Sequence, residues 1–422
     1  MTSPNRRITR KRVKIPVSEL QLGMYIAELD RPWAGTPFLY QGFYLYTPED
    51  IRDVRDVCEW VYIDAKQEDW TESVEKTISM PSGKKTIRIE QPRSRTTYLT
   101  KIPVSEEMPH AQQAFRNTRQ QVFQILDGLR FGDAIDVAAT EAVVAECVES
   151  IIRNPNALLC LSQIKNRDEY TAEHSLRVCL LSLALGRELG LLEGELQNLG
   201  ISALLHDVGK VRIPLEILNK PGALTPDEFE TMTSHTTQGK QILIANPGVY
   251  KGAVDVALSH HERMDGHGYP RQLQAHQIAY FAKIVSVADA YDAINSERIY
   301  KPGKSGLETL RILYDCRHSH FDGELVDAFI KTIGVYPVGH IAEMTNDEVG
   351  IIVASDSDYR LRPQVLLVLD KHHKPCRERG IDLKLNAVDK LGKPYRVKAI
   401  HKNGAFGIQL ETYLAKGLKI RR

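Results

Sequence analysis

The chain of 422 residues has no apolar run close to the roughly 20 residues that a membrane-spanning helix needs. Its 55 basic and 54 acidic side chains leave a net charge of +1, so no overall field attracts nucleic acid or an anionic membrane. The basic residues near its start are not followed by an apolar segment, which argues against a signal peptide. We therefore expect a cytoplasmic protein with no membrane span and no nucleic acid polymer as a partner.

Paired cysteines are also missing. The six cysteines are scattered and form no Cys-x-x-Cys motif: Cys58, Cys147, Cys160, Cys179, Cys316 and Cys376. Neither a disulfide framework nor a structural zinc site built on thiolates is expected. Hydrophobic residues make up 42% and charged residues 26%, as in a globular protein, and the length predicts two or three domains.

Residue patterns divide the first third of the chain into distinct parts. Residues 1–14 are predicted to be a flexible basic tail. Within residues 15–135, short stretches rich in aromatic and β-branched residues predict strands on either side of a helix at 48–59. Residues 67–113 contain prolines and show no clear period, so an irregular linker is predicted there.

From about Ala114 to residue 338 the chain follows a helical period instead. The expected helices cover 174–189, 195–210, 252–262, 278–296, 306–316 and 323–333, and another starts at Thr225-Pro226 and carries His235. Residues 339–422 return to strand-like stretches. The expected fold class is mainly α: a helical bundle with a mixed α/β N-terminal domain and a small β-rich C-terminal module.

Two compact motifs in the helical part carry chemistry. They are His206-Asp207-Val208-Gly209-Lys210 and His260-His261-Glu262-Arg263-Met264-Asp265-Gly266-His267-Gly268-Tyr269-Pro270. On a helix Lys210 would share a face with His206 and Asp207. Adjacent His260 and His261 would diverge by about 100°, which suits two neighbouring metal sites better than one chelated ion. Imidazole and carboxylate ligands favour Fe, Mn, Co, Ni or Zn in a catalytic site.

Each piece has a structural alternative. A single His-Asp dipeptide or a twin histidine is more often found on a helix surface. Their combination on segments that are otherwise apolar favours a metal site, because buried charges are costly unless they are paired or bind metal. Asp289 adds to this interpretation, since it lies on an otherwise apolar helix face beside Val285 and Ala288.

At these motifs the chain resembles the HD-GYP family, bacterial phosphodiesterases that cleave the signalling dinucleotide cyclic di-GMP. The resemblance covers the middle half of the chain and implies a helical bundle of the HD superfamily, with residues 140–338 as the catalytic domain. It implies these metal ligands: His174, His206, Asp207, His235, His260, His261 and Asp289. Residues 15–135 more weakly resemble a family of unknown function that often precedes HD-GYP domains, so a regulatory role is expected for them.

The resemblance also implies residues that contact the substrate. Gly268, Tyr269 and Pro270 would form a loop at the mouth of the site, and this loop is a possible contact surface for diguanylate cyclase (GGDEF) domains. Asp265 would orient that loop or a ligand histidine. Arg298 and Lys301 match the family's basic element that binds substrate phosphates. The structural alternatives are a plain turn and a helix C-terminus stabilised by cations.

Two departures from the family pattern matter. Some members hold three metals and carry a glutamate four residues before the first ligand histidine, where this chain has Tyr170. Glu169 is one residue away, on another part of the helix, so two divalent ions are expected. Residues 271–275 lack the glycines usual in the family, which changes the expected shape of the loop and not the metal site.

The sequence therefore predicts a metal-dependent phosphodiesterase. Asp207 would be a shared metal ligand, and Lys210 would offset charge on the phosphate. The product would be linear pGpG, or GMP after a second cleavage. Two rival functions stay open: a catalytically weak cyclic di-GMP sensor or scaffold, and an HD-type phosphohydrolase that acts on another nucleotide.

Overall fold

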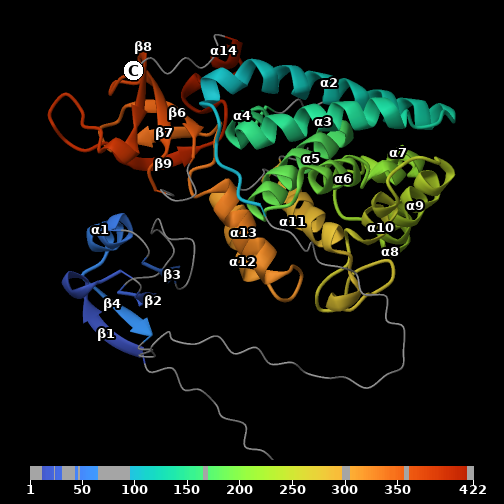
Figure 1. The fold of residues 1–422 in the computed structure, drawn as a ribbon, viewed down its shortest axis with the longest axis horizontal. Helices are drawn as coiled ribbons and strands as arrows, with labels where there is room; N and C mark the ends of the chain where they lie inside the picture. Colours follow the sequence, from blue (N-terminus) through green and yellow to red (C-terminus); the bar gives the residue numbers. More distant parts are fainter. Residues whose placement is uncertain are drawn as a thin grey trace, which may run out of the picture. The chain divides into compact units, whose positions relative to one another are not determined.

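The computed structural model describes residues 12–22, 24–30, 43–45, 48–64, 96–164, 170–296, 305–355 and 361–415. The chain forms two compact units, residues 1–88 and 89–422, which are described separately (Figure 1). Most of the expected basic tail and much of the expected linker lie outside the described residues, and so do Arg298 and Lys301.

In its described residues, the first unit is a small antiparallel sheet with one α-helix. Its elements are β1 (Arg12–Pro16), η1 (Val17–Glu19), β2 (Tyr25–Leu29), β3 (Phe43–Tyr44), α1 (Pro48–Val57) and β4 (Trp60–Asp64). The strand order is β1-β4-β2-β3. Ile26, Val54 and Val61 are fully buried, so α1 and the sheet share one apolar core. The expected mixed α/β character is confirmed.

Helices make up most of the second unit (Figure 1). They are α2 (Val104–Phe131), α3 (Val137–Arg153), α4 (Pro155–Leu161), α5 (Tyr170–Glu188), α6 (Glu193–Leu204), η2 (Val208–Arg212), α7 (Leu215–Leu218), α8 (Pro226–Thr233), α9 (His235–Ala245), α10 (Lys251–Ser259), η3 (Ala275–Gln277), α11 (Tyr280–Asn295), α12 (Gly306–Asp315) and α13 (Gly323–Ile333). Buried residues run almost all round α5, which packs against α2, α3, α4, α6, α11 and α13. This central helix therefore places His174 in the interior of the bundle. None of the described helices is long and apolar enough to cross a membrane.

Helix α2 begins ten residues before the helical period was expected to start. Val104, Met108, Ala111 and Ala114 are buried at helical spacing, and Pro109 is accommodated inside the helix. The predicted irregular linker is therefore wrong for residues 104–113. α2 packs against α3, α4 and α5 within the second unit. The division of the chain into a regulatory and a catalytic domain stays a prediction.

Three expected helices end earlier than the sequence suggested. α6 stops at Leu204, so His206 and Asp207 lie in a turn that leads into η2 and not on one continuous helix. α10 stops at Ser259, just before the twin histidines, and α8 ends at Thr233, so His235 opens a new helix. Side chains at helix ends can approach one point from several directions, which a single helix face does not allow.

The C-terminal module is a five-stranded antiparallel sheet with a short helix. Its elements are β5 (Ile341–Met344), β6 (Val349–Ala354), β7 (Gln364–Leu369), β8 (Pro375–Asp382), η4 (Leu383–Leu385), β9 (Val397–His401), η5 (Ala405–Gly407) and α14 (Leu410–Ala415). The strand order is β8-β7-β6-β5-β9. The Asn156 side chain on α4 bonds both backbone groups of Ser355 after β6, at 3.3 Å each. The sheet is thereby fixed to the helices, and the expected β-rich module is confirmed.

Candidate metal centre

The structure brings all seven candidate metal ligands together. They come from five places in the bundle: His174 on α5, His206 and Asp207 after α6, His235 at the start of α9, His260 and His261 after α10, and Asp289 on α11. Most are fully buried, and the His261 side chain keeps 26% exposure, which makes it the most accessible of the set. The convergence that the sequence implied is thus present.

The Asp207 carboxylate lies between two groups of imidazoles. Its Oδ1 is 3.4 Å from His235 Nε2 and 3.6 Å from His260 Nε2. Its Oδ2 is 3.5 Å from His174 Nε2 and 3.3 Å from His206 Nε2. Each oxygen therefore faces its own set of nitrogens, an arrangement in which one carboxylate can serve two cations.

Backbone carbonyls orient three of these histidines. Nδ1 of His206 lies 2.7 Å from the Ala203 carbonyl, and Nδ1 of His235 lies 2.7 Å from the Met232 carbonyl. His260 makes the same kind of contact through its own Nδ1, at 3.1 Å from two carbonyls of α10. A proton on Nδ1 leaves the Nε2 lone pair free to bind metal, so these contacts select the ligand tautomer.

His174 is oriented by a carboxylate that the sequence analysis missed. Its Nδ1 is 2.7 Å from Asp292 Oδ2, while its Nε2 is 3.0 Å from Asp289 Oδ1. Arg177 holds Asp292 through both oxygens, at 2.6 and 3.0 Å. Asp292 follows Asp289 by three residues, and Arg177 follows His174 by three. That spacing puts each pair on one helix face, so the sequence contained a signal that could have identified Asp292 and Arg177.

Burial and charge set the protonation states of the site. Burial lowers the pKa of His235 to about 4, and it also lowers the pKa values of His206 and His261. Burial alone would raise the pKa of Asp207, but Lys210 and His206 hold it well below its usual range. For His174, contacts with carboxylates outweigh burial and raise the pKa. Three imidazoles are therefore neutral near pH 7 and the central carboxylate is ionised, as ligands must be.

The donor set fits divalent cations. Among the described residues, His206 Nε2 and Asp207 Oδ1 are buried without a hydrogen-bond partner. Such atoms cost free energy unless something satisfies them, and cations bound at this cluster would do so. Nitrogen and carboxylate donors without sulfur suit Fe, Mn, Co, Ni or Zn.

Gly209 brings the His-Asp turn against α9. A Cβ at this position would overlap the carbonyl oxygen of His235 and the amide of Gly239. Only glycine therefore permits η2 to approach the start of α9 so closely. That approach is what places Asp207 and His235 within reach of one cation.

The Gly-Tyr-Pro loop, residues 262–273, covers part of the site. A Cβ on Gly268 would overlap the backbone of Glu262 and Arg263, so the loop folds back tightly on its own start. The Tyr269 ring lies 4.8 Å from the His261 ring, centroid to centroid, and the Tyr269–Pro270 peptide is cis. The Tyr269 ring therefore lies against a candidate ligand, and its role at the mouth of the site stays a prediction.

Comparisons with known proteins agree with this geometry. The family description "HD domain" matches residues 159–325, and "Domain of unknown function (DUF3391)" matches residues 12–140. The chain is 35% identical over 380 residues to "Cyclic di-GMP phosphodiesterase PA4108" of Pseudomonas aeruginosa, covering 88% of each protein. The chain belongs to the HD-GYP family.

Two further relatives match shorter parts of the chain. A "Cyclic di-GMP phosphodiesterase" of Thermotoga maritima is 43% identical over 166 residues, 39% of this chain and 45% of that protein. A "3'3'-cGAMP-specific phosphodiesterase 3" of Vibrio cholerae is 33% identical over 171 residues, 40% of this chain and 37% of that protein. Both matches cover less than half of each protein.

Glu262 anchors the Gly-Tyr-Pro loop of this HD-GYP protein. It is another residue that the sequence analysis missed. Its buried carboxylate accepts hydrogen bonds from the backbone of Arg271 at 2.7 Å and Leu273 at 2.9 Å. The Asp265 carboxylate accepts from the backbone of His267 at 3.1 Å and pairs with Arg263, so these side-chain contacts lie within the loop. Of the two roles expected for Asp265, the structure favours orientation of the loop.

The other expected substrate contacts are only partly described. The Lys210 ammonium pairs with Asp207, and its side chain keeps 19% exposure, so it lies between the buried ligands and solvent. Arg298 and Lys301 lie outside the described residues, and so does the side chain of Tyr170. The roles of these residues in this HD-GYP protein stay predictions.

Proposed function

We propose that this chain is a metal-dependent phosphodiesterase that hydrolyses cyclic di-GMP to linear pGpG, and to GMP if a second cleavage follows. The observation that carries the proposal is the buried Asp207 carboxylate, which four histidine Nε2 atoms surround at 3.3 to 3.6 Å. The relative that covers most of this chain is named a cyclic di-GMP phosphodiesterase, which supports the substrate.

We assign the ligands to two cations that share Asp207. His174 and His206 would hold one cation, His235, His260 and His261 would hold the other, and Asp289 would complete the set from α11. Bound there, such ions would activate water for attack at neutral pH and would polarise a phosphate oxygen. Tyr170 stands where family members with three metals carry a glutamate, which supports two ions and not three.

The protein's own side chains would position the phosphate and offset its charge. Lys210 stands at the solvent side of Asp207, where its ammonium can stabilise negative charge on phosphate oxygens. Tyr269 and Gly268 would shape the mouth of the site, with Pro270 fixing the loop exit. Arg298 and Lys301 would bind a second phosphate.

We further propose that the Gly-Tyr-Pro loop is a contact surface for a GGDEF domain and that residues 15–135 regulate the activity. The cytoplasm is the proposed compartment, because four of the cysteines are buried as free thiols, as expected in a reducing environment.

A hydrolysis panel tests the function. Protein purified without oxygen is analysed for its metal content and given cyclic di-GMP, 3'3'-cGAMP, nucleoside triphosphates and 2',3'-cyclic nucleotides. Multiple turnovers of cyclic di-GMP are expected, with 3'3'-cGAMP as the competing substrate because a similar protein is named for it. Preferential cleavage of triphosphates would contradict the proposal. Less than one product per protein over hours would instead favour a sensor or scaffold.

A further inference from the structure

A row of alternating charges connects the surface of α2 to a candidate metal ligand. Arg119 Nη2 on α2 lies 3.2 Å from Glu173 Oε1, and Glu173 Oε2 lies 3.6 Å from Arg177 Nη1. Arg177 holds Asp292, which contacts His174 Nδ1. The side-chain exposure falls from 34% at Arg119 to 8% at Glu173 and 6% at Arg177. The row therefore runs from solvent into the interior.

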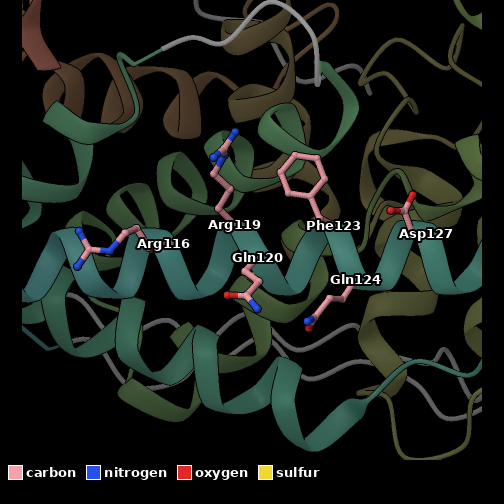
Figure 2. A pocket seen from close by; sticks show the side chains of 6 residues that line it. All are labelled: Arg116, Arg119, Gln120, Phe123, Gln124 and Asp127. Atoms are coloured by element: carbon pink, nitrogen blue, oxygen red, sulfur yellow. The ribbon is translucent and has the colours of Figure 1, made fainter.

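Arg119 is held in a defined direction on α2. Arg119 and Phe123 project from the same side of the helix (Figure 2), and the guanidinium carbon lies 5.3 Å from the ring centroid. Both line a surface depression of about 520 Å³ whose lining residues all belong to α2. An aromatic face and a carboxylate thus fix the guanidinium together.

The charges around Arg177 explain how Arg119 can act on the metal centre. Two buried carboxylates, Glu173 and Asp292, both lie beside the guanidinium of Arg177. Arg119 brings a further cation to Glu173, which weakens the attraction between Glu173 and Arg177 and favours both short bonds from Arg177 to Asp292. Without Arg119, Glu173 would compete for Arg177 and loosen the carboxylate that orients His174.

We propose that Arg119 and Glu173 are positioning residues for the metal centre and act on His174 through Arg177 and Asp292. α2 lies outside residues 159–325, which match the HD domain, so a helix before that domain would set the affinity of its metal site. The inference rests on the metal site of the proposed function and does not depend on the identity of the substrate.

Manganese binding to the full-length, metal-stripped protein tests it, with free Mn²⁺ followed by its electron paramagnetic resonance signal. Arg119→Ala should weaken Mn²⁺ binding about 3- to 10-fold, less than the 10- to 100-fold typical for a direct partner of a ligand. Arg119→Lys should restore most of the affinity, because it keeps the charge. Arg116→Ala is the matched control: Arg116 is exposed one turn away and bonds Gln113 on its own helix.

A double-mutant cycle separates this role from general support of the fold. In an Asp292→Asn background, Arg119→Ala should cause no further loss of Mn²⁺ affinity, because the connection is already broken. The same loss in both backgrounds, an equal loss in Arg116→Ala, or unchanged binding in Arg119→Ala would overturn the proposal. The Mn²⁺ binding assay contains no nucleotide. A protein that fails to hydrolyse cyclic di-GMP would therefore contradict the proposed function without changing the outcome of this test.

Discussion

Asp207 is the residue on which the site depends most, because both groups of candidate ligands meet at its carboxylate. Its pKa is held low by Lys210 and His206 although burial acts in the opposite direction. A buried carboxylate in that state is stabilised by its surroundings in its charged form. Its replacement therefore removes an anion that several neighbours share.

Asp207→Ala should abolish metal binding and hydrolysis together. The expected loss of affinity exceeds the roughly 10- to 100-fold typical of residues that only orient a ligand. Elemental analysis beside a hydrolysis assay measures both. Asp255→Ala, which removes an exposed carboxylate on α10, should leave both unchanged. Full metal content in Asp207→Ala would show that the assignment is wrong.

The Lys210→Ala variant should still bind metal but should hydrolyse cyclic di-GMP more slowly. Turnover of cyclic di-GMP should slow by about 10² to 10³, as for loss of one group that stabilises transition-state charge. Steady-state kinetics at matched metal content measure the effect. Lys240→Ala, at an exposed position on α9, serves as the control. If turnover is unchanged in Lys210→Ala, this lysine has no part in the reaction.

At the scale of elements, the site is made by helix ends. α6, α8 and α10 each stop just before a candidate ligand, and η2, α9 and the Gly-Tyr-Pro loop follow them. The close approach of η2 and α9 at Gly209 joins two of these ends. The position of Asp207 relative to His235 therefore depends on a backbone contact.

Gly209→Ala should damage fold and site together, because the added methyl group must push η2 away from the carbonyl of His235. The free energy of unfolding should fall by about 1 to 3 kcal/mol, as for other overpacked positions. Urea unfolding and Mn²⁺ titration measure the two effects. Gly194→Ala on α6 is the matched control, since a Cβ there meets no atom within 4 Å. Wild-type stability in Gly209→Ala would contradict the close approach.

At the scale of the whole molecule, the buried histidines make stability depend on pH when no metal is bound. Burial lowers the pKa of His235 from 6.5 to about 4. Between these values the unfolded chain takes up a proton that the folded chain does not. The contribution of His235 to the unfolding free energy is therefore fully present above pH 6.5 and is lost as the pH falls toward 4.

His235→Gln should reduce this dependence. Between pH 7 and pH 5, the metal-free wild type should lose about 2 kcal/mol more unfolding free energy than the variant. Urea unfolding of both proteins at the two pH values gives the difference. His174 titrates in the opposite sense, but it is present in both proteins and cancels in the comparison. Equal losses in the two proteins would show that His235 is not held neutral by burial.

The sequence predicted much of this molecule because local patterns carried the information. Helical spacing of apolar residues located most helices of the bundle, and aromatic and β-branched stretches located both sheets. It misjudged α2, because Pro109 and polar surface residues hid buried positions that make sense only once α3, α4 and α5 pack against them. Glu262 was missed for a related reason, since its partners lie further along the loop. Asp292 was missed because its helical spacing from Asp289 was not used, and its partners on α5 are evident only in the fold.

By itself the sequence determined which groups are available: seven imidazoles and carboxylates in motifs typical of one family, a lysine beside them, and glycines where the backbone must turn. Only the tertiary structure decided that these groups meet around Asp207, that backbone carbonyls select the histidine tautomers, and that Arg119 on α2 is connected to His174. The physical reason is that residue type is a property of the chain, whereas distance, burial and the pKa that follows from them arise only when separate helices pack together.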